Sequence, residues 1–263
     1  MPKFESYAQG TPNWVEVMAP DPSAARDFYT GLFGWEIEES PMDDQGNVYM
    51  IGTLRGDPIA GISGHLHEMA GHPAFWNVYL ATDNVDATAA KVEEAGGKVE
   101  AGPFDVMEHG RMAAIQDPTG ARVSLWQAKQ HVGTARANEP GTPIWNELVT
   151  PDVDRATQFY GDVLGMGVEK TEMPGGGGYT ALTVDGRMIG GAMEPTTEGL
   201  PPHWNVYFNV ESVDATVAQA EGLGARVLAP AFDVEGVGRM AFIADPQGGM
   251  FALMENPAPE DDE

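Results

Sequence analysis

The chain has 263 residues, a length that suits one large domain or two of ordinary size. Fourteen Lys and Arg residues against 40 Asp and Glu residues give a formal net charge of −26. Nucleic acids and anionic membrane surfaces would repel such a chain, so neither is an expected partner. A hydrophobic content of 42% excludes global disorder, and the lack of cysteine excludes disulfides and Cys-ligated zinc.

The sequence shows no targeting or membrane segment. Residues 1–9 contain no apolar run typical of a secretory signal, and no run in the chain reaches the ~20 apolar residues of a membrane helix. We therefore expect a soluble, cytoplasmic protein with no membrane partner.

The clearest feature of the sequence is an internal duplication. The segment WVEVMAPDPSAARDFYTGLFG at Trp14 returns as WNELVTPDVDRATQFYGDVLG at Trp145, and WNVYLATDNVDAT at Trp76 returns as WNVYFNVESVDAT at Trp204. A third pair, FDVMEHGRMAAIQDPTG and FDVEGVGRMAFIADPQG, completes the repeat. The repeats predict a first module over residues 11–127, a linker over 128–141, a second module over 142–256 and an acidic tail over 257–263.

The first half of each module has the pattern of a strand, a helix and short strands. In the first module, alternating strand formers from Trp14 predict a strand. Asp21 and Pro22 then supply an N-cap and a first helical residue, and Gly34 ends the helix. Short segments broken by glycine and aspartate predict further strands.

The second half of the module repeats this order. A strand over Trp76–Ala81 leads into a helix that ends at Gly96 and Gly97. More short strands follow, and the turn DPTG precedes a last strand over residues 122–127. Each module therefore predicts the order β-α-β-β-β twice.

This order of elements, with the motifs FYTGLFGW, a GG pair after the second helix and DPTG before the last strand, resembles the vicinal oxygen chelate (VOC) superfamily. That superfamily contains glyoxalase I, extradiol dioxygenases, fosfomycin-resistance enzymes and bleomycin-binding proteins. The resemblance covers both modules and looks closest to tandem two-domain actinobacterial members labelled hydroxylases. It implies an α+β fold with two tandem modules, in which four βαβββ motifs form cupped mixed sheets with helices outside. Whether each cup forms within one module or by exchange between the two stays open.

The resemblance also implies where a divalent metal would bind. The family's His and Glu ligands normally lie seven residues before the Asp that caps the first helix, six before the Asp that caps the second, and four after the glycine of the DPxG turn. In the two modules those places hold Trp14 and Trp145, Asn77 and Asn205, and Ser124 and Ala252. Because none of these is a histidine or a carboxylate, we expect no metal and no other cofactor.

The six histidines also depart from a duplicated metal site. None of them has a histidine at the equivalent position of the other module. A cluster of His65, His67 and His72 is conceivable, but polar loop histidines beside Gly64 and Gly71 are the simpler interpretation.

Alternation along the predicted strands places a set of aromatic, methionine and small polar side chains inside the cups. Such a surface suits a flat or apolar organic ligand. The alternative is that these residues pack the two modules against each other. The candidate ligand-binding residues are Trp14, Asn77, Tyr79, Ser124, Trp126, Trp145, Asn205, Tyr207 and Met254.

Two duplicated glutamates, Glu16 and Glu147, are the candidate catalytic residues. Each follows the lost ligand position by two residues and so shares the cup face. One interpretation pairs them with the duplicated Arg111 and Arg239. The other makes each a general base whose pKa is raised by burial.

The sequence thus leads to two function hypotheses. The first is a metal-free protein that binds a small, largely apolar or aromatic molecule in a cup, for sequestration, resistance or metabolite handling. The alternative is an enzyme of glyoxalase-like lyase, hydroxylase, dioxygenase-like or isomerase type that uses Glu16 and Glu147 or an unrecognised metal site. We expect a monomer, because the fused modules imitate a dimer; the ligand and the working cup stay open.

Overall fold

The computed structural model describes residues 3–41, 48–65, 71–172, 178–197 and 199–256. The acidic tail, His67 and most of the glycine-rich segment 174–178 therefore lie outside the described residues. The first module contains β1 (Pro12–Ala19), α1 (Pro22–Phe33), β2 (Glu36–Pro41), β3 (Val48–Leu54), β4 (Asp57–Gly64), β5 (Phe75–Ala81), α2 (Val85–Glu94), β6 (Lys98–Val106), β7 (Gly110–Gln116) and β8 (Arg122–Ala128).

The second module repeats this order of elements. It contains β9 (Pro143–Val149), α3 (Val153–Leu164), β10 (Gly167–Glu172), β11 (Gly178–Val184), β12 (Arg187–Met193), β13 (His203–Asn209), α4 (Val213–Gly222), β14 (Arg226–Val234), β15 (Gly238–Ala244) and β16 (Met250–Glu255). The predicted α+β class with four βαβββ units is thereby confirmed. None of the helices in the described part of the chain is both long and apolar enough to cross a membrane.

Each module forms one mixed sheet of eight strands. The strand order is β2-β3-β4-β1-β5-β8-β7-β6 in the first and β10-β11-β12-β9-β13-β16-β15-β14 in the second. In the first module β1 runs parallel to β4 and antiparallel to β5, and β5 runs parallel to β8. All strands of a sheet come from one module, so each cup forms within its own module.

The helix boundaries follow from the caps that the sequence predicts. The side chain of Asp21 accepts hydrogen bonds from the backbone N–H groups of Ser23 and Ala24, which have no partner inside the helix. Gly34 ends α1 with φ at 70°, a left-handed conformation that glycine adopts without steric cost. Asp152 and Gly165 have the same roles in α3.

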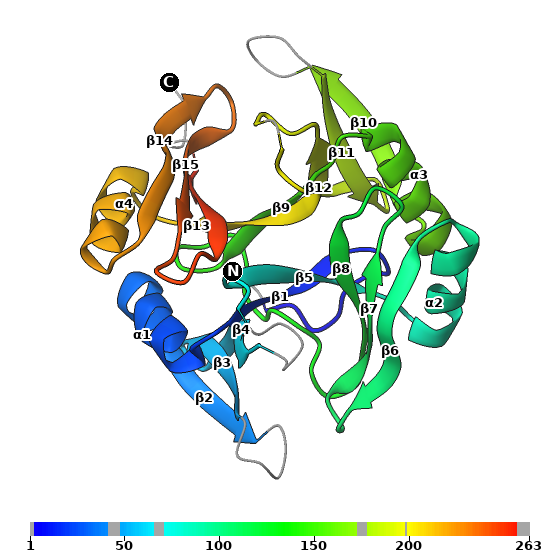
Figure 1. Cartoon of the computed structure of the whole chain (residues 1–263), viewed down its shortest axis with the longest axis horizontal. Helices are drawn as coiled ribbons and strands as arrows, with labels where there is room; N and C mark the ends of the chain where they lie inside the picture. Colours follow the sequence, from blue (N-terminus) through cyan, green and yellow to red (C-terminus); the bar gives the residue numbers. More distant parts are fainter. Residues whose placement is uncertain (1–2, 42–47, 66–70, 173–177, 198, 257–263) are drawn as a thin grey trace.

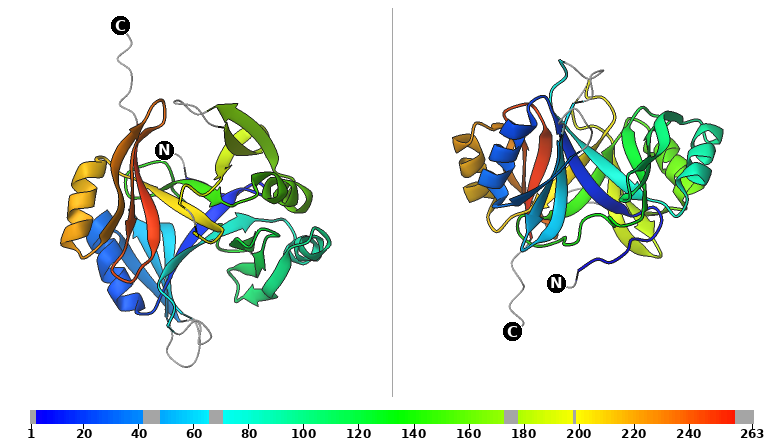
Figure 2. Two further views of the ribbon diagram at one scale, coloured as in Figure 1. Left: turned by 45° about the horizontal axis from the view of Figure 1, so that its top comes forward. Right: turned by 90° about the horizontal axis from the view of Figure 1, so that it is seen from below.

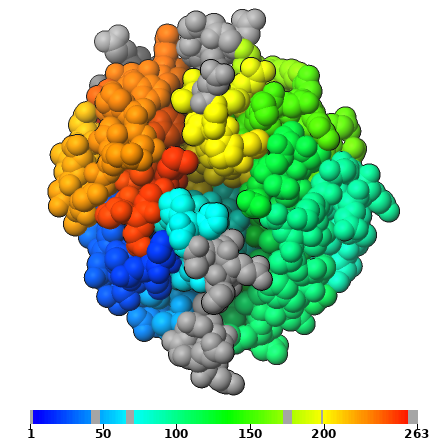
Figure 3. All heavy atoms as spheres, viewed as in Figure 1, coloured from blue at the N-terminus to red at the C-terminus, as the bar shows by residue number. Residues whose placement is uncertain are grey.

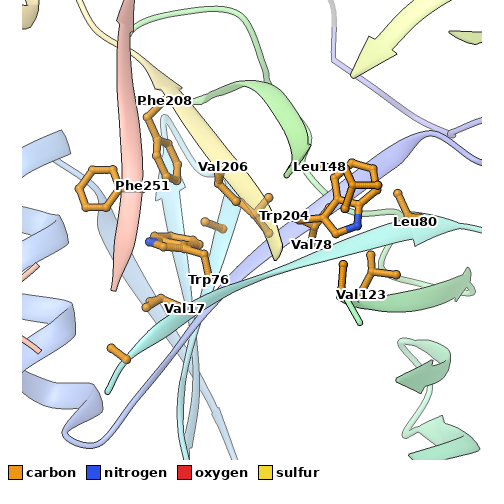
Figure 4. Close-up of a cluster of buried hydrophobic side chains, with 14 of the residues drawn as sticks. Val17, Trp76, Val78, Leu80, Val123, Leu148, Trp204, Val206, Phe208 and Phe251 are labelled. Carbon is orange, nitrogen blue, oxygen red and sulfur yellow. The ribbon is translucent and has the colours of Figure 1, made fainter. Parts of the chain in front are cut away.

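The two modules pack through the helix-bearing faces of their sheets. Buried side chains such as Trp76, Val78, Val206 and Phe208 form one core that runs through both modules (Figure 4). In Figure 1 the first module occupies the lower half and the second the upper half, with α1 beside α4 and α2 beside α3. Figure 2 shows the same helix pairs from two other sides. On the surface, residues of the second module in orange lie against the blue residues of α1 (Figure 3).

Alternation along each strand separates this core from the opposite face. On β1, Val15, Val17 and Ala19 belong to the core, whereas Trp14 and Glu16 point to the other face. We call that other face, without helices, the cup face of each module. The predicted site residues lie on it.

Candidate functional site

A buried glutamate lies at the centre of each cup face. Glu16 is 4% exposed and Glu147 is 6% exposed. Asn77 on β5 is the strand partner of Glu16, and Asn205 on β13 is the strand partner of Glu147. The duplication therefore brings the same pair of residue types together twice.

Hydroxyl groups hold both glutamates. The carboxylate of Glu16 accepts hydrogen bonds from Ser63 and from the phenol of Tyr79, the latter at 2.5 Å. Burial raises the pKa of Glu16 above its usual value, and these two hydrogen bonds lower it only in part. Both oxygens of Glu16 thus accept hydrogen bonds inside the protein.

Glu147 has a different set of neighbours. It accepts hydrogen bonds from Tyr179 at 3.0 Å and from Tyr207 at 2.6 Å. Burial raises its pKa, while the two phenols and the nearby His203 lower it. Met193, whose side chain cannot donate, stands here where the first module has Ser63. His203 lies beside this glutamate, whereas Phe75 stands at the equivalent position of the first module.

The predicted ion pairs of these glutamates are wrong. Arg111 bonds Asp86 at 2.9 Å and Asp105 at 3.4 Å, and Arg239 makes the equivalent contacts with Asp214 and Asp233. Each arginine pairs with these aspartates rather than with the buried glutamate because the aspartates are exposed, and an exposed charged pair keeps most of its hydration. Glu16 and Glu147 are thus held by hydroxyls rather than by a cation.

Sequence analysis missed a duplicated tyrosine in each site. The indole Nε1 of Trp14 donates to the hydroxyl of Tyr49 at 2.9 Å, and that of Trp145 donates to Tyr179 at 3.0 Å. The hydroxyls lie over Gly61 and Gly191, where a Cβ atom would overlap them. The signal was present in the sequence, since Tyr49 and Tyr179 each follow a glycine-containing segment at equivalent places in the two modules.

The predicted cup residues gather in two separate clusters. In the first module Trp14, Tyr79 and Trp126 pack together, and Asn77 Nδ2 donates to Ser124 Oγ at 2.9 Å. In the second module an apolar cluster forms from Tyr207, Met240 and Ala252 with Ile144, Trp145, Val234, Val237, Phe242 and Met254 around them. Each cluster draws on one module only. The residues that join the modules lie on the opposite faces, so module packing does not account for the cup residues.

The segment after β8 covers the first cup face. The ring of His131 packs edge-on against Trp14, with ring centroids 4.5 Å apart, and Trp126 donates to the carbonyl of His131 at 2.8 Å. The backbone N–H of Thr134 adds a 2.7 Å hydrogen bond to Asn13. Burial lowers the pKa of His131 to about 4. As a result Trp14 is 4% exposed and Trp126 is 6% exposed.

The second cup face is more accessible. Trp145 and Met254 are half-buried there, whereas Tyr179 and Asn205 are half-buried as Tyr49 and Asn77 are in the first module. The counterparts of Trp145 and Met254, Trp14 and Trp126, are buried, and Met254 is smaller than the indole of Trp126. An aromatic and sulfur-containing surface with an amide beside it can contact a flat ligand and hydrogen-bond one of its polar atoms.

The cup residues do not fit the metal site that the VOC resemblance implies. The indole of Trp14 is a donor only and is engaged with Tyr49, and the amide of Asn77 is engaged with Ser124. Within the described ranges, no three His, Asp or Glu side chains converge to hold an ion. His65 Nε2 lies 3.1 Å from the carbonyl oxygen of Met18, His72 is exposed, and His67 is outside these ranges.

The sequence of each module matches one family model, the Glyoxalase/Bleomycin resistance protein/Dioxygenase superfamily, over residues 11–125 and 142–253. The chain belongs to this superfamily. The VOC resemblance predicted from the motifs is thereby confirmed.

Two relatives match the chain over nearly all of its length. A protein named "Putative glyoxylase CFP32" of Mycobacterium tuberculosis is 45% identical over 99% of this chain and 100% of its own length. The "Anthracycline biosynthesis protein DauV" of a Streptomyces species is 36% identical over 95% of this chain and 94% of its own. The whole tandem arrangement is therefore shared with these proteins.

Solved structures of VOC enzymes have the same fold at low sequence identity. The 2,3-dioxygenase LapB of a Pseudomonas species aligns with a TM-score of 0.65 at 18% identity, covering 97% of each chain. The Mn(II)-bound glyoxalase of Novosphingobium aromaticivorans aligns with a TM-score of 0.64 at 19% identity, covering 95% of this chain and 83% of its own. These likenesses concern the fold alone.

Proposed function

We propose that this protein binds a small, largely apolar or aromatic organic molecule on the cup face of the second module, without a divalent metal. The observation that carries the proposal is the unequal cover of two duplicated surfaces. Trp14 and Trp126 are buried beneath His131 and its neighbours, whereas Trp145 and Met254 at the equivalent positions are half-buried. A ligand can reach the second surface and would have to displace the chain from the first.

The chemistry of the second cup face supports an aromatic ligand. Trp145, Phe242 and Met254 offer ring faces and a polarisable sulfur around the buried Tyr207. Two Streptomyces relatives are named for anthracycline biosynthesis, and anthracyclines are flat polycyclic aromatic molecules. Sequestration, resistance or handling of such a metabolite is the role that we propose for this chain.

The binding test uses the duplication as its control. Met254→Trp places in the second module the indole that Trp126 has at the equivalent position of the first. We expect this variant to bind a naphthalene probe at least tenfold more weakly. Trp126→Met makes the reverse change beneath His131 and should leave affinity unchanged. Isothermal titration calorimetry should give one site per chain. Two equal sites, or unchanged affinity in Met254→Trp, would contradict the assignment to the second module.

The metal-free state is tested separately. Protein purified without a chelator or a tag and incubated with Ni, Zn, Mn, Fe and Co should retain far less than one ion per chain by inductively coupled plasma mass spectrometry. Tight retention of one ion would overturn this part of the proposal. Sedimentation should find a monomer, since the back-to-back modules already supply a pseudo-dimer.

A second candidate is a proton-transfer enzyme with Glu147 as base. Burial raises the pKa of Glu147 toward the range in which a carboxylate is an effective base, and His203 lies nearby. A relative with 45% identity carries the name glyoxylase. In this case Glu147→Gln should abolish turnover of a screened substrate, whereas Glu16→Gln, on the covered face, should retain most of it. Equal activity in Glu147→Gln and wild type would exclude Glu147 as the base.

A further inference from the structure

The two cup faces differ at the asparagine opposite the central glutamate. In the first module Asn77 Nδ2 donates to Ser124 Oγ, and Ser124 is the β8 partner of Tyr79. In the second module the equivalent partner of Tyr207 is Ala252, whose methyl group accepts no hydrogen bond. Asn205 Nδ2 therefore has no hydrogen-bond partner among the described residues, on a side chain that is half-exposed.

A histidine orients this amide. His203 Nδ1 lies 2.8 Å from the carbonyl oxygen of Pro201, which can only accept, so Nδ1 carries a proton. His203 Nε2 lies 3.1 Å from Oδ1 of Asn205 and donates to it when the ring is protonated on both nitrogens. The contact holds Oδ1 at the ring and leaves Nδ2 on the other side of the amide. Phe75 stands at this position in the first module and offers no such bond.

Glu147 lies close to His203 on the second cup face. Glu147 on β9 is the strand partner of Asn205. Its carboxylate accepts hydrogen bonds from the phenols of Tyr179 on β11 and Tyr207 on β13. β12 contributes Met193 and β16 contributes Ala252 and Met254 to this face, which adds no further charge. Glu147 is thus the carboxylate that these strands place beside the imidazole.

We propose that Asn205, oriented by His203, donates a hydrogen bond to the carbonyl oxygen of an aromatic carbonyl compound that lies against Trp145, Phe242 and Met254. This inference rests on the proposed function and names its ligand class as an aryl ketone or quinone. The first module cannot bind a carbonyl in this way, for two reasons. Its amide, that of Asn77, already donates to Ser124, and His131 covers its tryptophans. The lack of cysteine means that a quinone ligand would meet no thiol in this chain.

The test compares 2-acetylnaphthalene with 2-isopropenylnaphthalene, which has the same shape without the carbonyl. In Ala252→Ser the new hydroxyl should accept a hydrogen bond from Asn205 Nδ2, as Ser124 Oγ accepts one from Asn77 Nδ2. We expect the affinity for the ketone relative to the hydrocarbon to fall about three- to tenfold. Binding of the hydrocarbon should not change. Ser124→Ala in the covered module is the matched control and should leave both affinities unaltered.

A second variant separates orientation from simple packing. The two probes make this separation, since a loss of packing lowers both affinities and a loss of orientation lowers the affinity for the ketone alone. His203→Phe, which copies Phe75, should lower the preference for the ketone and leave the affinity for the hydrocarbon unchanged.

The outcomes distinguish the two proposals. If both probes bind but Ala252→Ser and His203→Phe leave their ratio unchanged, the carbonyl assignment is overturned and the proposed function stands. If neither probe binds to the wild-type chain, both are overturned. Thermal unfolding of each variant verifies that a lost preference does not come from a lost fold.

Discussion

The phenol of Tyr29, on the first helix of the first module, donates a 2.7 Å hydrogen bond to the carboxylate of Asp245, in the last turn of the second. Trp76 Nε1 donates in turn to the Tyr29 oxygen at 3.1 Å. Burial, and then the neighbouring Asp245, raise the pKa of Tyr29, which keeps the phenol protonated and able to donate. The relationship is reciprocal, since Tyr160 of the second module donates to Asp117 of the first at 3.1 Å.

These paired contacts explain why the DPxG turn has an aspartate. One oxygen of Asp245 receives the backbone N–H groups of Gln247 and Gly249, which shapes the turn, and the other receives Tyr29. The turn motif therefore also fastens each module to the other. The back-to-back arrangement directs both cup faces away from the junction.

Removing the Tyr29 hydroxyl should loosen this junction. Tyr29→Phe leaves Oδ2 of Asp245 and Nε1 of Trp76 without this partner in a buried site, so we expect a loss of about 2–3 kcal/mol in the free energy of unfolding. Urea denaturation measures it, and a double-mutant cycle with Asp245→Asn isolates the pair. Gln219→Ala removes an exposed intermodule hydrogen bond to Gly31 and is the control, with an expected loss below about 0.5 kcal/mol. Equal losses in the two variants would contradict a special role for Tyr29.

A methyl group at Gly191 should displace Tyr179. The Cβ of an alanine there would overlap the Tyr179 hydroxyl, and the ring cannot retreat without breaking its hydrogen bonds to Trp145 and Glu147. We expect Gly191→Ala to destabilise the protein by about 1–3 kcal/mol and to weaken ligand binding. Gly222→Ala, where a Cβ would contact nothing, should be neutral or stabilising by up to about 1 kcal/mol. Thermal unfolding of both variants decides the matter, and a neutral Gly191→Ala would show that the glycine is dispensable.

The duplication made the fold predictable from sequence. Asp21, Pro22 and Gly34 marked the limits of a helix by local backbone chemistry, and the alternation of Trp14 and Glu16 with buried valines marked the two faces of a strand. Such signals depend on residues that are close in the chain. Their repetition in the second module gave each one an independent test.

The site was less predictable because its contacts join distant strands. Tyr49 on β3 reaches Trp14 on β1 across β4, and its place depends on the register that Gly61 permits. The cover of the first cup face by His131 has no counterpart in the repeat, so duplication could not indicate it. The predicted pair of Glu16 and Arg111 was wrong because it also depended on contacts between distant segments. Arg111 instead forms ion pairs with Asp86 and Asp105.

Replacing Glu147 by glutamine should alter the pH dependence of stability. The pKa of Glu147 is raised in the folded state, so that state binds more protons than the unfolded chain does above about pH 4.5. The stability of wild type relative to Glu147→Gln should therefore fall as the pH rises from about 4.5 to 7, by on the order of 1 kcal/mol. Urea titrations at pH 4.5 and 7 measure the difference, with the exposed Glu221→Gln as control. A relative stability that rises with pH would mean that the folded state favours the carboxylate.

His131 should give the opposite dependence in a different pH range. Burial, with a smaller contribution from His109, lowers its folded-state pKa from 6.5 to about 4. The unfolded chain therefore binds the extra proton first, and the stability present above pH 6.5 is lost as the pH falls toward 4.

His131→Phe keeps a ring against Trp14 and Trp126 but cannot titrate. We expect wild type to lose about 1–2 kcal/mol relative to this variant between pH 7 and 4.5, measured by urea unfolding. The exposed His72→Phe is the control. Parallel pH curves for wild type and His131→Phe would mean that the imidazole is hydrated, and the first cup face would then be as open to a ligand as the second.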